Sequence, residues 1–303
     1  MIQSSDKDRV QKAVAWLMLG VTGGLLLDLF AKELLRTYSL EQFIFLRSLI
    51  AIVLLLAIAP RFGGVGSLRS NRKAWHLLRT ILSVGAMFGF FYGLSQMPLV
   101  NAFTLGYTAP LMMTGLSAIF LSEPVGWRRW TAVVFGFIGV LVMLRPGQGE
   151  LSFAAIAVLI AAFCYACQAI TARRLAETES TLALSFYVVV GPMLVSTILL
   201  DEQGWLDPDL VGWALLIGAG ASSVLAWIGF VNGYRAASPA LLAPLEYTAL
   251  IGGAIAGFVF WDEVPDKWVA IGALIIVGSG LFVVYRNNEV SELPERTAES
   301  SGS

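Results

Sequence analysis

Residues 99–124 read LVNAFTLGYTAPLMMTGLSAIFLSEP, and residues 239–264 read PALLAPLEYTALIGGAIAGFVFWDEV. An offset of 140 residues superimposes the two stretches. The matching positions are Tyr107-Thr108-Ala109 with Tyr247-Thr248-Ala249, Glu123 with Glu263, Gly93 with Gly233, Leu54 with Leu194, and Leu35 with Leu175. Self-similarity at one offset, extending well beyond the quoted stretches, indicates two copies of one structural unit.

The composition around these stretches is that of a membrane protein. Of the 303 residues, 57% are hydrophobic and 14% are charged, whereas a soluble domain carries roughly 25% charged residues. The net charge of −1 gives no bias toward nucleic acid. Cys164 and Cys167 lie in an apolar run and His76 is the single histidine, so we expect no disulfide framework, no metal and no cofactor.

The hydrophobic runs predict an all-α integral membrane protein with ten transmembrane helices. Each run is long enough to cross a bilayer as a helix, which takes about 20 residues. The predicted spans are 13–31, 40–59, 75–96, 99–121, 128–144, 151–172, 182–200, 210–234, 240–261 and 267–285. The long continuous runs favour helices over the short alternating strands of a barrel.

The repeat divides the chain into two inverted units. Residues 13–147 form the first five-helix repeat, and residues 148–286 form the second. Because five is odd, the second copy enters the membrane from the opposite side, an arrangement typical of secondary transporters. Residues 1–12 are expected as a cytoplasmic N-terminus and residues 287–303 as a disordered cytoplasmic tail.

The stretch 91–147, FYGLSQMPLVNAFTLGYTAPLMMTGLSAIFLSEPVGWRRWTAVVFGFIGVLVMLRPG, resembles the EamA family of bacterial metabolite and amino-acid exporters, within the drug/metabolite transporter superfamily. The matching elements are Met97-Pro98, Ala109-Pro110, Glu123, Gly136 and Gly139. The second half departs from the pattern at Leu250, opposite Pro110. The resemblance covers about residues 10–286 and implies ten helices, an inverted repeat, and a cavity lined by spans 1, 3, 4, 6, 8 and 9.

The basic residues predict the orientation. With ten spans, fourteen of the 20 Lys and Arg residues fall at one side and four at the other. The side richer in Lys and Arg is cytoplasmic by the positive-inside rule. We therefore expect a multi-pass protein of the bacterial inner membrane with both termini in the cytoplasm.

Polar and aromatic side chains at membrane depth are the candidate solute-binding residues, because ionisable groups inside spans are costly. Glu246 is the first candidate, as a proton acceptor or a counter-charge to an ammonium group. Asp28 is a second candidate for gating or coupling. The structural alternative is a helix-packing role for Glu246 and a structural ion pair for Asp28. The full set of candidate binding residues is Glu246, Tyr247, Tyr107, Asn101, Thr108, Tyr92, Trp16, Tyr165, Gln168 and Trp227.

Several of these candidates carry specific structural expectations. Asp28 and Lys32 are spaced to form an i, i+4 ion pair on span 1. Tyr107 and Tyr247 are expected to bracket the cavity from its two ends. The Arg47 side chain is long enough to snorkel to the interface, and the family resemblance implies a structural role for it, with Glu41 or Asp28 as its partner. Arg79 and His76 are interpreted as interfacial.

These features favour a secondary transporter that exports small amphipathic metabolites by alternating access. Amino acids, aromatic ones included, are the expected solutes. The alternatives are another solute class, such as an organic cation or drug, a nucleotide or a cofactor precursor, or a membrane-embedded enzyme. An enzyme is disfavoured because no nucleophile–base pair or ligand set is evident at depth. We expect a monomer or homodimer in the lipid bilayer, with no nucleic-acid partner.

Overall fold

The computed structural model describes residues 2–121, 127–144, 152–201, 204–237 and 242–279. Glu123 and the tail at 287–303 lie outside these residues. The described chain is helical and contains no strand. Its elements are α1 Ile2–Leu34, α2 Leu40–Ile58, η1 Ala59–Phe62, η2 Val65–Leu68, α3 Lys73–Gln96, α4 Leu99–Gly106, α5 Ala109–Phe120, α6 Trp127–Leu144, α7 Phe153–Arg174, α8 Thr181–Leu199, α9 Leu210–Ala236, η4 Ala243–Tyr247, α11 Thr248–Trp261 and a helix at Lys267–Ser279.

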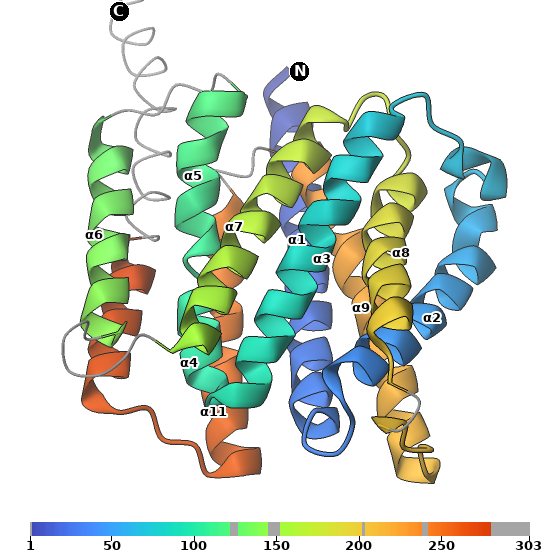
Figure 1. Ribbon diagram of the computed structural model, residues 1–303. Coiled ribbons are helices and arrows are strands. Elements are labelled where there is room, and N and C mark those ends of the chain that lie inside the picture. Colours follow the sequence, from blue (N-terminus) through green and yellow to red (C-terminus); the bar gives the residue numbers. More distant parts are fainter. Residues whose placement is uncertain (1, 122–126, 145–151, 202–203, 238–241, 280–303) are drawn as a thin grey trace, which may run out of the picture.

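Seven of the described segments are long and apolar enough to cross a membrane. They are Arg9–Leu34, Leu40–Phe62, Lys73–Gln96, Leu99–Phe120, Phe153–Arg174, Thr181–Leu199 and Leu210–Ala236. Three shorter apolar helices, Trp130–Leu144, Leu245–Trp261 and Lys267–Ser279, fall within the predicted spans 128–144, 240–261 and 267–285. The protein is therefore a multi-pass membrane protein, with its helices standing side by side (Figure 1).

The fourth predicted span is not one continuous helix. α4 ends at Gly106 and α5 begins at Ala109, because Pro110 has no N–H to donate to the preceding turn. At the break, the Leu105 carbonyl oxygen accepts both the backbone N–H of Thr108 at 3.1 Å and the Thr108 hydroxyl at 2.7 Å. The ninth span likewise begins with a 3₁₀ turn, η4, which has a proline in its first turn. Both breaks lie next to the tyrosines of the repeated Tyr-Thr-Ala triplet.

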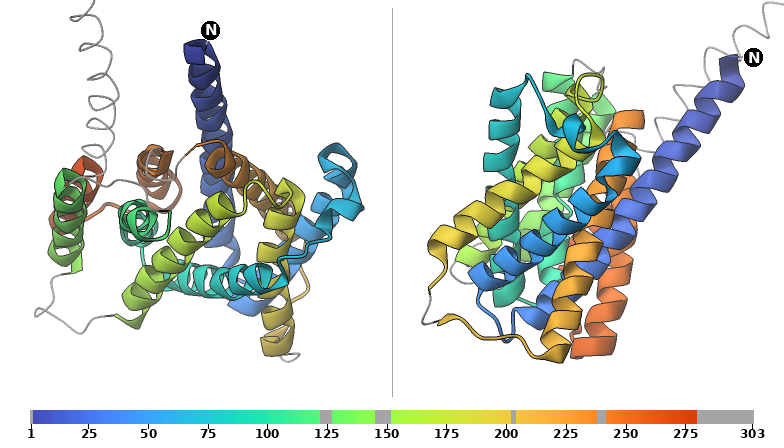
Figure 2. Two further views of the ribbon diagram at one scale, coloured as in Figure 1. Left: turned by 90° about the horizontal axis from the view of Figure 1, so that it is seen from above. Right: turned by 90° about the vertical axis from the view of Figure 1, so that its right-hand side faces the viewer.

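The tightest packing joins helices that are far apart in sequence. α1 crosses α9 so closely that a Cβ atom on Gly229 would lie 2.3 Å from the backbone nitrogen of Gly20. Likewise, α3 packs on α7, where a Cβ atom on Gly89 would lie 2.6 Å from the carbonyl oxygen of Ala157. Small residues permit such backbone approach between membrane helices. α6 and the Lys267–Ser279 helix pair with each other at one edge, through Gly139 and Gly272 (Figure 2).

Interactions at the helix termini define two ends of the bundle. The His76 end holds Arg9 of α1, the first turn of α3 and the last turns of α7 and α9, because Arg9 donates to the Ala236 carbonyl, Arg173 donates to the Arg235 carbonyl, and His76 contacts Glu179. The Lys32 end holds the last turns of α1, α3 and α11. α1 therefore runs from the His76 end to the Lys32 end, and α7 runs in the opposite direction (Figure 1).

Candidate functional site

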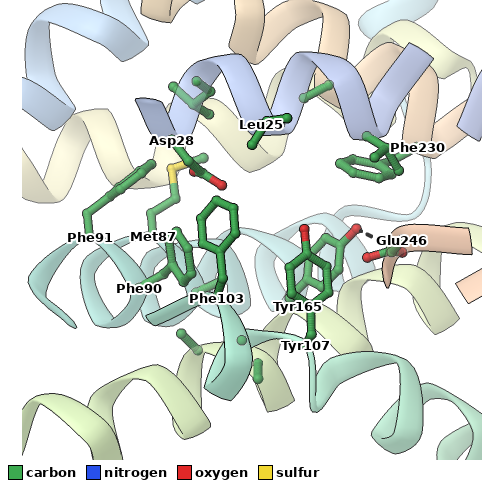
Figure 3. Close-up of a pocket in the computed structure, with 18 of the residues that line it drawn as sticks. Leu25, Asp28, Met87, Phe90, Phe91, Phe103, Tyr107, Tyr165, Phe230 and Glu246 are labelled. Carbon is green, nitrogen blue, oxygen red and sulfur yellow. Dashed lines mark hydrogen bonds between the residues drawn. The ribbon is translucent and has the colours of Figure 1, made fainter. Parts of the chain in front are cut away.

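A cavity of about 180 Å³ lies among the helices at the centre of the bundle (Figure 3). Its walls come from α1, α3, α4, α7, α9 and η4, which correspond to the predicted spans 1, 3, 4, 6, 8 and 9. That expectation is confirmed. The lining residues are Val21, Gly24, Leu25, Leu27, Asp28, Ala86, Met87, Phe90, Phe91, Phe103, Gly106, Tyr107, Ala161, Ala162, Tyr165, Ala226, Trp227, Phe230 and Glu246.

Aromatic rings form a large part of the cavity wall. Seven of the lining residues are aromatic. Phe103 meets Tyr107 edge-on at 5.8 Å between ring centroids, and Tyr165 meets Phe230 in the same way at 5.8 Å. Aromatic faces bind flat apolar groups and attract cations through the ring quadrupole. The wall therefore suits a solute that carries a planar ring, a positive charge, or both.

Glu246 provides a carboxylate that is held by hydrogen bonds. It is 4% exposed and lies in η4, toward the His76 end of the cavity. The Tyr165 hydroxyl donates to Glu246 Oε1 at 3.3 Å, and the Tyr234 hydroxyl donates to the same oxygen. Figure 3 shows Tyr165 and Glu246 meeting at one side of the cavity. Two phenols thus orient this carboxylate.

Asp28 provides a second carboxylate, on α1 at the other side of the cavity (Figure 3). It is half-buried, and within the described part of the chain it makes no hydrogen bond or ion pair. The predicted ion pair with Lys32 is wrong. The Lys32 ammonium instead lies 3.0 Å from the Glu263 carboxylate and donates to the Met97 carbonyl oxygen at 2.9 Å. These two acceptors draw the lysine away from Asp28 toward the turn between α3 and α4.

Arg47 lies behind the cavity wall and acts electrostatically on Asp28. The Arg47 side chain is fully buried, so it does not snorkel, and this burial fits the structural role that the family resemblance implies. Its guanidinium donates to the Ser223 hydroxyl at 2.7 Å and to the Met87 sulfur at 2.8 Å, and it lies 5.8 Å from the Phe91 ring. These partners replace the water that snorkelling would have supplied.

At the Lys32 end, contacts join the two halves of the chain. In addition to Lys32, Glu263 accepts a hydrogen bond from the Leu99 backbone nitrogen at 2.6 Å. A carboxylate at the first turn of α4 is favoured by the exposed N–H groups there. The Trp261 indole also donates to Glu33 at 3.2 Å. Glu263 therefore ties α1 and α4 to the end of α11.

At the His76 end, a buried network surrounds Glu179. His76 Nε2 lies 3.0 Å from Glu179 Oε2, and the Ser70 hydroxyl donates to Glu179 Oε1 at 2.8 Å. Arg235 donates to the Glu179 carbonyl oxygen. His76 and Arg79, which the sequence places near the interface, are 4% and 1% exposed and so are buried in the protein at this end of the bundle. Packing of α3 against α7 and α8 covers both side chains, a tertiary effect that one span cannot reveal.

The remaining predicted residues lie outside the cavity wall. The Tyr92 ring packs on Phe153 at 5.6 Å, and Trp16 is 38% exposed. Thr108 is buried and bonded to its own helix turn, and Gln168 is 1% exposed beside the cavity rather than on it. Asn101 lies on α4 and is half-buried. Of the ten predicted binding residues, the structure brings Glu246, Tyr107, Tyr165 and Trp227 together around the cavity.

Tyr107 and Tyr247 do not bracket the cavity from its two ends. Their ring centroids lie 6.0 Å apart, and Tyr247 is 3% exposed without lining the cavity. The helix breaks at the two triplets bring the tyrosines together at one place, so their equivalence in the repeat does not translate into opposite positions.

Sequence reasoning missed the phenylalanines of the wall and Tyr234. Phe90, Phe91, Phe103 and Phe230 line the cavity. In a membrane span a phenylalanine that faces lipid has the same sequence signature as one that faces a cavity. The spacing of Phe230 and Tyr234, one helical turn apart and stacked at 6.3 Å, is a signal that could have drawn attention to this face of α9.

Comparisons with known proteins agree with this architecture. The sequence pattern of the EamA-like transporter family matches residues 11–145 and, a second time, residues 152–285. The S-adenosylmethionine uptake transporter of Rickettsia felis is 30% identical over 273 residues, which is 90% of this chain and 92% of that protein. The riboflavin transporter of Vibrio cholerae is 31% identical over 77% of this chain and 79% of that protein.

Two further similarities are more distant. The pseudopaline exporter of Pseudomonas aeruginosa is 25% identical over 83% of this chain and 88% of that protein. A solved crystal structure shares the fold, with a TM-score of 0.68 and 20% identity over 91% of this chain and 98% of that one. Because the family pattern covers both halves of the sequence, this protein belongs to the EamA-like transporter family of the drug/metabolite transporter superfamily.

Proposed function

We propose that this protein carries a cationic solute with a planar ring system across the membrane by alternating access, with S-adenosylmethionine as the first candidate. The observation that supports this most directly is the pairing of seven aromatic lining residues with a carboxylate, Asp28, that has no hydrogen-bond donor in the described chain. A half-buried carboxylate without a donor is costly unless a cation approaches it. Aromatic faces beside it add cation–π attraction and stacking.

The solutes named for the relatives support a planar ring system in the transported solute, and one of them also supports a positive charge. S-adenosylmethionine and riboflavin both contain a large flat ring system, and S-adenosylmethionine also carries a sulfonium and an ammonium group. Riboflavin is neutral and offers Asp28 no positive charge. These relatives do not support the expected export of amino acids. One is named for the uptake of S-adenosylmethionine and another for the export of pseudopaline. We therefore place S-adenosylmethionine ahead of free amino acids.

We further propose that all ten apolar helices cross the membrane as two inverted five-helix repeats, 13–147 and 148–286. The double match of the family pattern supports this division. So does the packing, because Gly89 of α3 approaches the Ala157 carbonyl of α7 as Gly229 of α9 approaches the Trp16 carbonyl of α1. Gly89 and Gly229 occupy equivalent positions in the two repeats, and each approaches the first helix of the other repeat. The opposite directions of α1 and α7 fit the inversion.

Alternating access is proposed to open the Lys32 end and the His76 end in turn. The two ends are held by different groups, Lys32 with Glu263 at one and His76 with Glu179 at the other. Each pair joins a helix of the first repeat to a residue of the second. Rocking of one repeat against the other would break one pair while the other persists. The distribution of basic residues supports a cytoplasmic His76 end, which holds Arg9, Arg173 and Arg235.

The proposal is tested by solute flux into proteoliposomes containing the purified full-length chain. We expect saturable uptake of radiolabelled S-adenosylmethionine, which unlabelled S-adenosylmethionine abolishes and which neutral riboflavin reduces weakly at equal concentration. Protein-free liposomes give the background. Flux of phenylalanine or riboflavin with no flux of S-adenosylmethionine would contradict the cationic class while leaving family membership intact.

A further inference from the structure

Arg79 is a buried cation whose partners are all neutral. It lies on α3 and is 1% exposed. Its guanidinium donates to the Gln168 carbonyl oxygen at 2.7 Å, the Thr171 hydroxyl at 2.9 Å and the Leu184 carbonyl oxygen at 3.1 Å. Within the described part of the chain no carboxylate forms an ion pair with it. A buried charge is normally paired with an opposite one, so Arg79 lacks the group that its charge favours most.

Gln168 places an unused amide beside this cation. The Gln168 side chain is 1% exposed, and neither its nitrogen nor its oxygen has a hydrogen-bond partner in the protein. The Nε atom of Arg79 is also without an acceptor. Buried polar groups are hydrogen-bonded in the great majority of cases. Two unused N–H donors, one of them charged, therefore lie close together inside the bundle.

Both side chains line one small cavity next to the main one. This cavity has a volume of about 10 Å³, close to the space of one water-sized group. Its other lining residues include Tyr165, Trp227 and Phe230, which also line the main cavity. The three aromatic side chains thus separate the two spaces. Since Arg79 follows His76 by one turn on α3, the small cavity lies between the main cavity and the His76 end.

We propose that Arg79 and Gln168 form a subsite for a carboxylate of the transported solute, entered when the aromatic side chains between the two cavities move aside. A planar carboxylate accepts two N–H groups at once and pairs strongly with arginine. The subsite extends the proposed function. Its place in the transport path rests on that function. A solute with a cation for Asp28 and a carboxylate for Arg79 spans both cavities, as an amino-acid group joined to a cationic ring system would.

The subsite is tested with sodium benzoate and benzamide as probes, by the thermal unfolding of the purified full-length protein. The two probes share a ring that fits against Tyr165, Trp227 and Phe230, and they differ only in the carboxylate. We expect benzoate to raise the melting temperature concentration-dependently and benzamide to have little effect. From the two dose curves we expect benzoate to bind at least about tenfold more tightly, the ratio typical of a hydrogen bond to a charged group.

Variants separate binding from packing. Arg79→Gln removes the cation and loses the benzoate response, but it also removes helix contacts and lowers the melting temperature without ligand. Gln168→Leu removes only the unpartnered amide, so we expect an unchanged or higher melting temperature without ligand together with a benzoate response that falls toward that of benzamide. Ser117→Ala is the matched control. Like Gln168→Leu it removes a buried polar group without a partner, here a hydroxyl, but Ser117 lies outside both cavities.

Each outcome decides the proposal. Equal responses to benzoate and benzamide in the wild type overturn the subsite, and so does a full benzoate response in Gln168→Leu. A benzoate response that Gln168→Leu loses and Ser117→Ala keeps supports it. Failure of S-adenosylmethionine flux is a separate result, because a benzoate-specific response in the same preparation would leave the subsite standing and overturn only the choice of solute.

Discussion

The two carboxylates of the cavity differ in how the protein treats them. Glu246 is buried and accepts hydrogen bonds from the Tyr165 and Tyr234 hydroxyls. Asp28 is half-buried and, among the described residues, has no donor, although Arg47 acts on it from behind the wall. The protein thus fixes the position of Glu246 with its own side chains and leaves Asp28 open. We infer that Asp28 meets the solute directly and that Glu246 shapes the opposite side of the cavity.

The largest effect is expected for Asp28→Asn. The substitution keeps the size of the side chain and removes the charge that faces the solute. Losing one partner of a desolvated charge pair costs several kcal/mol, so we expect S-adenosylmethionine flux at subsaturating concentration to fall at least about thirtyfold. The measurement is initial uptake into proteoliposomes at matched protein content.

Glu33→Gln is the control for Asp28→Asn. Glu33 lies on the same helix, but its side chain is 49% exposed and outside the cavity. We expect flux within about twofold of the wild type, because exposed ion pairs contribute little. Equal losses in the two variants would show that any neutralised carboxylate on α1 impairs the protein, and would remove the special role of Asp28.

A smaller effect is expected for Glu246→Gln. The amide oxygen still accepts hydrogen bonds from the two phenols, so the cavity keeps its shape while the charge is lost. We expect flux to fall about three- to tenfold, the range for one hydrogen bond losing its charged acceptor. If Glu246 takes part in proton coupling, an imposed pH gradient changes the flux in the wild type and leaves that of Glu246→Gln unchanged.

The pH-gradient experiment also tests the difference in role between Asp28 and Glu246. Flux that is independent of the gradient in both proteins would remove proton coupling through Glu246 and leave facilitated diffusion. A gradient response lost in Asp28→Asn but kept in Glu246→Gln would exchange the two roles.

The smallest effect is expected for Tyr234→Phe. This change removes one of the two donors to Glu246 and leaves the stacked ring of Phe230 in place. Because Tyr165 still donates to Glu246, we expect the lost hydrogen bond to contribute only about 0.5 kcal/mol, which corresponds to a two- to threefold loss of flux, together with a lower melting temperature. Tyr187→Phe is the matched control, since its hydroxyl donates to the Leu68 carbonyl oxygen at the His76 end and not to the cavity. A loss of flux in Tyr187→Phe as large as that in Tyr234→Phe would contradict a specific role for the Glu246 contact.

The sequence predicted which helices surround the cavity better than it predicted the contacts of individual side chains. Glu246 and Asp28 could be singled out because ionisable groups are rare at membrane depth. The burial of Arg47 and Arg79 could not be predicted, because a long basic side chain on an isolated helix can either reach water or turn inward. Their buried acceptors, such as the Ser223 hydroxyl and the Leu184 carbonyl, lie more than a hundred residues away in the chain.

By itself the sequence determined a membrane protein, its helical spans, its family resemblance and the two carboxylates worth examining. Hydrophobic length and the cost of exposed backbone in lipid act locally, so they can be read along the chain. Only the tertiary structure decided that Lys32 pairs with Glu263, that Tyr107 lies beside Tyr247, and that Arg79 is buried without a carboxylate. These outcomes depend on which helices approach one another, and that is decided by the packing of distant small residues.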